Sequence, residues 1–202
     1  MPQFVPDVFE RLHELGSPQH VYICGAGPNG RAAYDKIPAD AYTMACNCLI
    51  EYPRTWTLWC AIDGFAREMS WWSAPVPRET KVLLSHGLVP YHENVDYSCD
   101  VKWTVGQDWY PMKSIMFNGA TVVGVLTQLA FFMGVKHITY VGVDMKGSKH
   151  YDGSYAYPYP GPWHQLHRLS AIVKFLKKKI RFDSLTPTLL AIPVVADNKE
   201  HL

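Results

Sequence analysis

The chain has 202 residues, of which 48% are hydrophobic, so it is long enough to bury a substantial core within one domain of ordinary size. Lysine and arginine total 19 against 18 acidic residues, and the resulting formal charge of +1 excludes a global attraction to nucleic acid or to an anionic membrane. We therefore expect a single domain over residues 1–202 that recognises its partners through local sites.

The cysteines and the apolar stretches favour a cytoplasmic protein. Five cysteines occur without paired Cys-x-x-Cys spacing and without a secretory signal, which is typical of free thiols in a reducing compartment. The longest apolar stretch, residues 120–134, is shorter than the roughly 20 residues that cross a bilayer, so we expect a buried helix and no transmembrane segment. The sequence is compatible with a homo-oligomer but does not specify one.

The first half of the chain predicts alternating helices and strands. Apolar spacing indicates an amphipathic helix over residues 7–15. The apolar run 20–24 leads directly into glycines, as a central parallel strand does when it feeds a phosphate-binding loop. A short helix at 31–36 and strands at 41–46, 57–62 and 81–84 are predicted next, and residues 86–117 are assigned to loops and short elements.

The second half continues the alternation. A helix over 121–133 precedes a strand over 137–144, and a helix over 164–179 precedes a strand over 180–185. Between them, residues 145–163 are rich in tyrosine, glycine and proline, a composition suited to a short lid. The order of elements predicts an α/β fold with a Rossmann-like, mostly parallel sheet flanked by helices.

A glycine-rich turn follows the first predicted strand and matches the pattern G-x-G-x-x-G. Such a turn between a strand and a helix lets the main chain approach a phosphate, with the N–H groups of the helix facing it. The alternative is a tight turn that binds nothing. The candidate nucleotide-binding residues here are Gly25, Ala26, Gly27, Pro28, Asn29 and Gly30.

Polar residues also follow the other predicted strands. A fold that binds NAD or FAD needs an acidic residue at the end of its second strand, but this chain has Asn47 there, which disfavours both dinucleotides. Asp63 follows the third strand, and Asp144 ends the strand after the long helix. Because the carboxyl ends of parallel strands line one crevice, we expect these side chains to converge on a nucleotide.

Two further segments could contact a ligand. The stretch Asn118, Gly119, Ala120 and Thr121 precedes the long helix and either offers N–H groups to a phosphate or simply caps that helix. His164 stands where the predicted lid meets a helix, and a histidine there either acts as a general base or only packs, with His167 as the next candidate. No metal-binding motif is evident.

In order and spacing, these motifs resemble the bacterial sialyltransferases that use CMP-sialic acid to extend lipooligosaccharide, together with related uncharacterised and pterin-diphosphokinase-like proteins. The resemblance is carried by residues 21–29, 45–47 and 134–144 and by His164. The chain differs from the family at Ala26 and Asn29, where the sialyltransferases have asparagine and serine, and its predicted lid is shorter. It also lacks the family's C-terminal extension.

The resemblance implies a glycosyltransferase that takes a sugar from a nucleotide donor, most simply a CMP-sugar, without a required metal. His164 would be the general base, Tyr151 and Tyr155 would assist the departing phosphate, and Asn47 would contact the nucleotide. The sequence does not identify the acceptor. Two alternatives remain: a magnesium-dependent diphosphokinase-like transfer from ATP using Asp63 and Asp144, and a non-catalytic protein that binds or sequesters a nucleotide.

Overall fold

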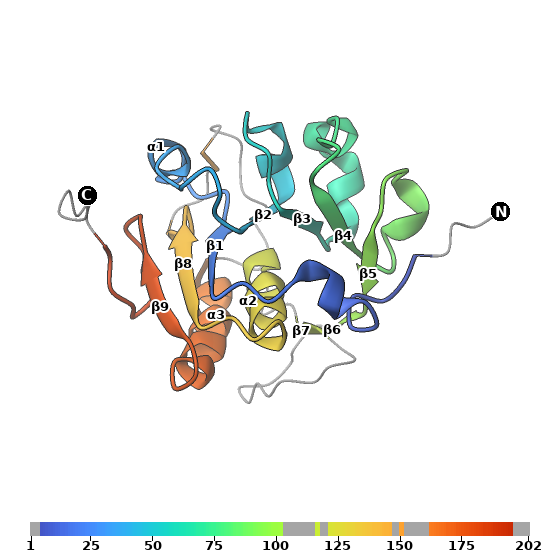
Figure 1. Ribbon diagram of the computed structural model, residues 1–202. Helices are drawn as coiled ribbons and strands as arrows, with labels where there is room; N and C mark the ends of the chain where they lie inside the picture. Colours follow the sequence, from blue (N-terminus) through green and yellow to red (C-terminus); the bar gives the residue numbers. More distant parts are fainter. Residues whose placement is uncertain (1–4, 103–115, 118–120, 147–149, 152–161, 196–202) are drawn as a thin grey trace.

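The computed structural model describes residues 5–102, 116–117, 121–146, 150–151 and 162–195. Its main feature is a seven-stranded sheet in the order β5-β4-β3-β2-β1-β8-β9 (Figure 1). Every neighbouring pair in it is parallel, which confirms the predicted α/β fold. The strands are β1 His20–Cys24, β2 Thr43–Cys46, β3 Leu58–Ala61, β4 Lys81–Ser85, β5 Tyr97–Cys99, β8 His137–Val141 and β9 Arg181–Ser184; a separate parallel pair comprises β6 Val101–Lys102 and β7 Met116–Phe117.

The chain adds strands first on one side of β1 and later on its other side, so the strand order reverses between β1 and β8. From β1 the chain adds strands towards β5, and it then returns to place β8 and β9 on the other side of β1 (Figure 1). The segments that follow β1 and β8 therefore leave neighbouring strands in different directions. Ligands of open parallel sheets bind at the carboxyl ends of the strands at such a switch point.

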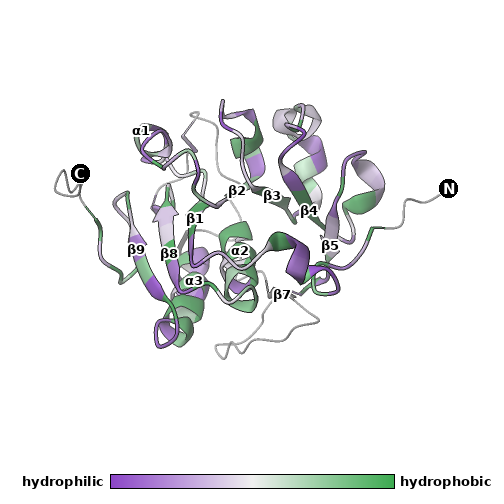
Figure 2. Ribbon diagram, in the orientation of Figure 1, coloured by the Kyte–Doolittle hydropathy of each residue, from purple (hydrophilic) through white to green (hydrophobic). Residues whose placement is uncertain are grey.

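Short and long helices cover the two faces of the sheet. The helices α2 and α3 and the 3₁₀-helix η1 pack on one face, and short helices pack on the other (Figure 1). Because both faces are covered, most strand residues are buried, and α2 is hydrophobic along most of its length (Figure 2). The helices are η1 Leu12–Leu15, α1 Arg31–Tyr34, η2 Asn47–Glu51, η3 Gly64–Glu68, η4 Ser70–Ser73, η5 Val89–Tyr91, α2 Val122–Phe132 and α3 Pro162–Leu176.

One expectation from the sequence needs correction near the N-terminus. The helix predicted over residues 7–15 is reduced to η1, because the preceding backbone lies extended along β5: Val8 N–H donates to Ser98 O at 2.8 Å. The edge strand β5 lies within a segment that we assigned to loops and short elements. It has three residues, too few to show a period of two in the sequence.

A polar network joins β1, β8 and β9 at their amino ends. The rings of His20 and His137 stack with their centroids 3.9 Å apart, and His137 Nε2 donates to Asp183 Oδ2 at 2.7 Å. Thr139 Oγ1 donates to Asp183 Oδ1 at 2.6 Å, so it accepts from His20 Nε2 at 2.8 Å. Burial, and then the neighbouring His137, lower the pKa of His20 to about 4.

This network predicts a loss of stability in mild acid. An unfolded histidine binds a proton near pH 6.5, whereas folded His20 does so near pH 4, so the free energy of unfolding should rise with pH across this window. After discounting for the partial exposure of His20, we expect a change of about 1–2 kcal/mol. Urea unfolding at pH 4.5 and pH 7 measures it, and His20→Gln should reduce the difference. His13→Gln, at an exposed histidine, is the control; an equal effect of both variants would contradict the prediction.

Candidate functional site

The glycine-rich turn after β1 is bound to the segment after β8. Gly27 N–H donates to Gly142 O at 2.7 Å, and Asn29 N–H donates to Asp144 Oδ2 at 2.8 Å. Tyr34 Oη, from α1, donates to Gly25 O at 2.5 Å. The two loops at the switch point are thus held together by main-chain contacts.

These contacts explain why the turn contains glycines. A Cβ atom on Gly27 would lie 2.5 Å from Gly142 O and 2.8 Å from Asp144 Oδ2. A Cβ atom on Gly30 would collide with the ring of Tyr34. The close approaches that require glycine are therefore made to the protein itself.

The N–H groups of this turn are consequently engaged. Those of Gly27 and Asn29 donate to the β8 segment, and that of Gly30 donates to Gly27 O at 2.9 Å. In this conformation these three N–H groups have partners within the protein, and the nucleotide-binding role expected for the turn stays a prediction. A ligand at this turn would meet its outer surface and the side chains around it.

Asp144 is a buried carboxylate beside the glycine-rich turn. It is 3% exposed, and while Oδ2 accepts from Asn29, its Oδ1 atom has no hydrogen-bond partner among the described residues. Burial raises the pKa of Asp144, because the charged form loses its water. A buried, half-satisfied carboxylate at the carboxyl end of a strand is a candidate for contact with a ligand's donor group.

We expect Asp144→Asn to weaken nucleotide binding without lowering the melting temperature. The amide retains an oxygen for Asn29 N–H but has no charge to desolvate, so the melting temperature should stay equal or rise. In the variant, an amide nitrogen can take the place of Oδ1, and a nitrogen that donates cannot accept a hydrogen bond from the ligand. We therefore expect the affinity for the nucleotide to fall by about tenfold or more. Differential scanning fluorimetry and calorimetric titration with CMP measure the two effects; a lower melting temperature with unchanged affinity would refute this account of Asp144.

Asn47 follows β2 in a left-handed conformation, with φ of 51°. Its carbonyl accepts from the indole Nε1–H of Trp59, on β3, at 2.8 Å. Within the described part of the chain, its side-chain amide makes no hydrogen bond, so the amide is available to a ligand. Trp59 was not among the residues predicted for the site.

Asp63 lies at the carboxyl end of β3, as expected. It is partly buried, and burial raises the pKa of its carboxyl group. Its charge also contributes to raising the pKa of the Cys46 and Cys60 thiols, which places it beside the ends of β2 and β3. All five cysteines are free, as predicted, and all are buried.

Tyr151 ties the start of the predicted lid to the same edge of the sheet. Its N–H donates to Ala26 O at 2.8 Å, and its hydroxyl donates to Cys48 O at 3.3 Å. Its neighbour His150 places Nδ1 4.0 Å from Cys48 Sγ. The segments after β1, β2 and β8 are thereby brought together. His150 was missed, although its position in the lid segment was a signal that could have identified it.

Of the other residues predicted to contact a ligand, one caps a helix and several lie outside the described residues. Thr121 caps α2, its Oγ1 accepting from Val123 N–H at 3.2 Å, which is the simpler of the two roles considered for it. Asn118, Gly119, Ala120 and Tyr155 lie outside the described residues, as do 147–149 and 152–161 of the predicted lid.

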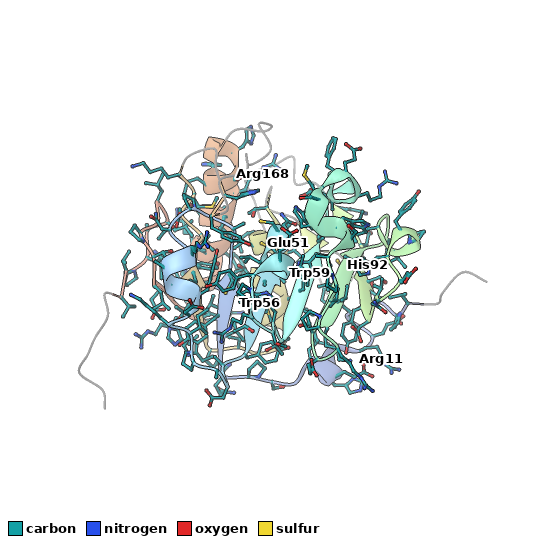
Figure 3. The ribbon with its side chains drawn as sticks, turned by 90° about the horizontal axis from the view of Figure 1, so that it is seen from above. Arg11, Glu51, Trp56, Trp59, His92 and Arg168 are labelled. Carbon is teal, nitrogen blue, oxygen red and sulfur yellow. The ribbon has the colours of Figure 1, made fainter. Side chains whose placement is uncertain are left out.

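His164 lies in the first turn of α3 and is exposed. No hydrogen bond joins it to the glycine-rich turn among the described residues. Arg168, one helical turn further, is partly buried and has no ion pair in the described part of the chain. Figure 3 shows Arg168 towards the side of the molecule opposite Arg11.

The described residues form neither a metal-ligand cluster nor a membrane-spanning helix. No group of three or more histidine, cysteine or acidic side chains is placed to hold a metal ion within them. No helix among them is long and apolar enough to span a bilayer.

Among known proteins, similarity to this chain is found in three-dimensional structure and not in sequence. No protein-family model matches the sequence, and no curated protein matches it. The MAf glycosyltransferase from Magnetospirillum magneticum AMB-1 is similar with a TM-score of 0.61 at 12% identity; the match covers 91% of this chain but 34% of that one. This chain therefore spans about a third of that protein.

Two sialyltransferases from Campylobacter jejuni match over most of both chains. CstII, in complex with the substrate analogue CMP-3FNeuAc, gives a TM-score of 0.54 at 16% identity, covering 92% of this chain and 89% of CstII. The monofunctional α-2,3-sialyltransferase Cst-I gives 0.53 at 13% identity, covering 100% and 86%. At these identities the similarity establishes architecture, and the chain has the fold of these glycosyltransferases.

Proposed function

We propose that this protein is a glycosyltransferase that takes its sugar from a nucleotide donor, most simply a CMP-sugar. The proposal is supported by the positions of Asn47, Asp63 and Asp144 after β2, β3 and β8, at the carboxyl edge of a sheet whose fold matches CstII over nearly its whole length. CstII has been solved with CMP and with CMP-3FNeuAc.

The proposed roles follow from the positions of the residues. Asn47 would contact the base or ribose through its amide, and the open Oδ1 of Asp144 would accept from a donor group of the nucleotide. The guanidinium of Arg168, one turn beyond His164, makes no ion pair within the described part of the chain and would attract the donor phosphate. Tyr151, with Tyr155, would act near the leaving group.

The reaction would be a single displacement without a required metal. His164 would accept the proton of the acceptor hydroxyl as its oxygen bonds to the anomeric carbon. The bond from that carbon to the donor phosphate would break in the same step, and CMP would leave with the electron pair. Polar groups fixed around the leaving phosphate would stabilise its growing charge.

A second candidate is a magnesium-dependent, diphosphokinase-like transfer. It is favoured by the two partly or fully buried carboxylates, Asp63 and Asp144, at the ends of β3 and β8. In that case ATP and magnesium would bind together and CMP would not bind. A third candidate, a non-catalytic nucleotide-binding protein, would bind CMP without any turnover.

A thermal-shift panel of CMP, CDP, UDP, GDP, ATP and NAD, with and without magnesium, separates the first two candidates, and an assay of sugar transfer separates the first from the third. A ligand at a hundred times its Kd adds about 2.7 kcal/mol to the stability of the folded state. We expect CMP and CDP to raise the melting temperature without magnesium. A shift with NAD alone would overturn the proposal, and a shift with ATP only when magnesium is present would establish the second candidate.

A further inference from the structure

Residues 185–190, which we call the brace, follow β9 and bind the main chain at the carboxyl end of β8. The strands β8 and β9 are parallel neighbours in the sheet (Figure 1). Beyond them, Thr188 Oγ1 donates to Val143 O at 2.7 Å, and Leu189 N–H donates to Asp144 O at 3.1 Å. The brace therefore holds the backbone of the segment that carries the candidate ligand contact.

Thr186 is the buried polar residue of the brace, with 2% of its surface exposed. Its Oγ1 atom accepts from Gly142 N–H at 3.0 Å. Ser184 Oγ donates to Thr186 O at 2.7 Å, which fixes the main chain of Thr186 itself. Because a buried hydroxyl is destabilising unless it is hydrogen-bonded, the amide of Gly142 accounts for a threonine here in place of an apolar side chain.

The same hydroxyl lies beside the carboxylate of Asp144. Burial raises the pKa of Asp144, whereas Asn29 and, to a smaller extent, the Thr186 hydroxyl lower it. Since Thr186 Oγ1 accepts from Gly142 N–H, its own proton points elsewhere, and it donates to no other residue in the described part of the chain. Thr186 thus faces both a main-chain amide of the switch-point loop and the carboxylate that follows it.

The position of Asp144 depends on the bend at Gly142. Gly142 has φ of 66°, a conformation that glycine adopts most readily. Its carbonyl accepts from Gly27 N–H at 2.7 Å, while its N–H donates to Thr186. The bend is therefore held on one side by the glycine-rich turn and on the other by the brace. Without the Thr186 hydroxyl, the bend would relax and the carboxylate two residues further would move.

We infer that Thr186 is a positioning residue for the nucleotide site, which fixes the bend at Gly142 and directs the Asp144 carboxylate towards the ligand. The inference rests on the proposed function, because it assigns to that same site a residue that acts through Asp144. Thr186 itself need not touch the ligand. A carboxylate that is already fixed loses less conformational freedom when the ligand binds.

Thr186→Val keeps the shape of the side chain and removes the hydroxyl. We expect it to weaken CMP binding about tenfold in calorimetric titration, whereas Thr186→Ser, which retains the hydroxyl, should stay within about twofold of the unaltered protein. Thr127→Val is the matched control, because Thr127 is fully buried and its hydroxyl donates to Val123 O at 2.7 Å within α2. The control should lower the melting temperature and leave the affinity for CMP unchanged.

A double-mutant cycle with Asp144→Asn tests the same contact without a ligand. Thr186→Val should lower the melting temperature by about 2 °C or more less in the Asp144→Asn background than in the unaltered protein, because one partner of the hydroxyl is already changed. If the valine variant does not fold, Thr186→Ala takes its place in both measurements.

Three outcomes would each overturn the inference: equal losses of CMP affinity in Thr186→Val and Thr127→Val, a Thr186→Ser variant that binds CMP as weakly as Thr186→Val, or additive effects on the melting temperature in the cycle. If the unaltered protein does not bind CMP, the proposed function fails. The cycle still shows in that case whether Thr186 and Asp144 act together.

Discussion

A Gly142→Ala variant is expected to lose about 3 kcal/mol or more of its free energy of unfolding. Gly142 has φ of 66°, which strains any other residue, and it lies where the segment after β8 meets the glycine-rich turn. A Cβ atom there would lie 2.6 Å from Tyr34 Oη and 3.0 Å from Gly30 Cα, and closer still to Gly25 O. None of these atoms belongs to a flexible surface side chain, since Tyr34 is fully buried.

Gly134→Ala is the control for the strain alone. Gly134 has φ of 83°, but a Cβ atom on it would meet nothing within 4 Å, so we expect a loss of about 1–2 kcal/mol. Urea unfolding of both variants measures their losses of free energy of unfolding. The difference between the two losses is the cost of the steric clash at position 142. Equal losses would show that the two loops at the switch point can separate freely. CMP binding should also fall in Gly142→Ala, because the carbonyl that holds Gly27 N–H would shift.

The sequence predicts the sheet well because its strands are buried on both faces. Apolar runs identify β1, β2, β3, β4 and β8 without reference to their partners, and the segment after the helix over 164–179 was assigned to the last strand, β9. The strand order depends on long-range pairing, and β5 is too short to leave a pattern.

The candidate site is harder to predict, because its contacts cross between strands. The glycine pattern in 25–30 fits a phosphate loop, yet the structure shows that its glycines make room for Gly142, Asp144 and Tyr34. No local pattern contains this information, since these partners lie up to 117 residues away from Gly27. Trp59 reaches Asn47 because β2 and β3 pair with Ala45 beside Trp59, a register that the sequence does not reveal.

His164→Ala is expected to retain CMP binding and to lose transfer activity about a hundredfold or more. The residue is exposed, so its truncation leaves no cavity and should not change the melting temperature. Donor binding is proposed to depend on Asn47, Asp144 and Arg168, none of which makes a side-chain hydrogen bond to His164 among the described residues. The measurements are the transfer of sugar from a CMP-sugar donor and calorimetric titration with CMP.

Two matched variants decide which histidine accepts the proton. His167→Ala removes an exposed imidazole from the same helix and should leave transfer unchanged. His150→Ala removes the imidazole beside Cys48 Sγ, near the glycine-rich turn that Tyr151 joins. If His150→Ala alone abolishes transfer at unchanged CMP affinity, the base is His150 and the role proposed for His164 is wrong. A base must reach the acceptor hydroxyl directly or through one water, so this outcome would place the acceptor over the ends of β1 and β2.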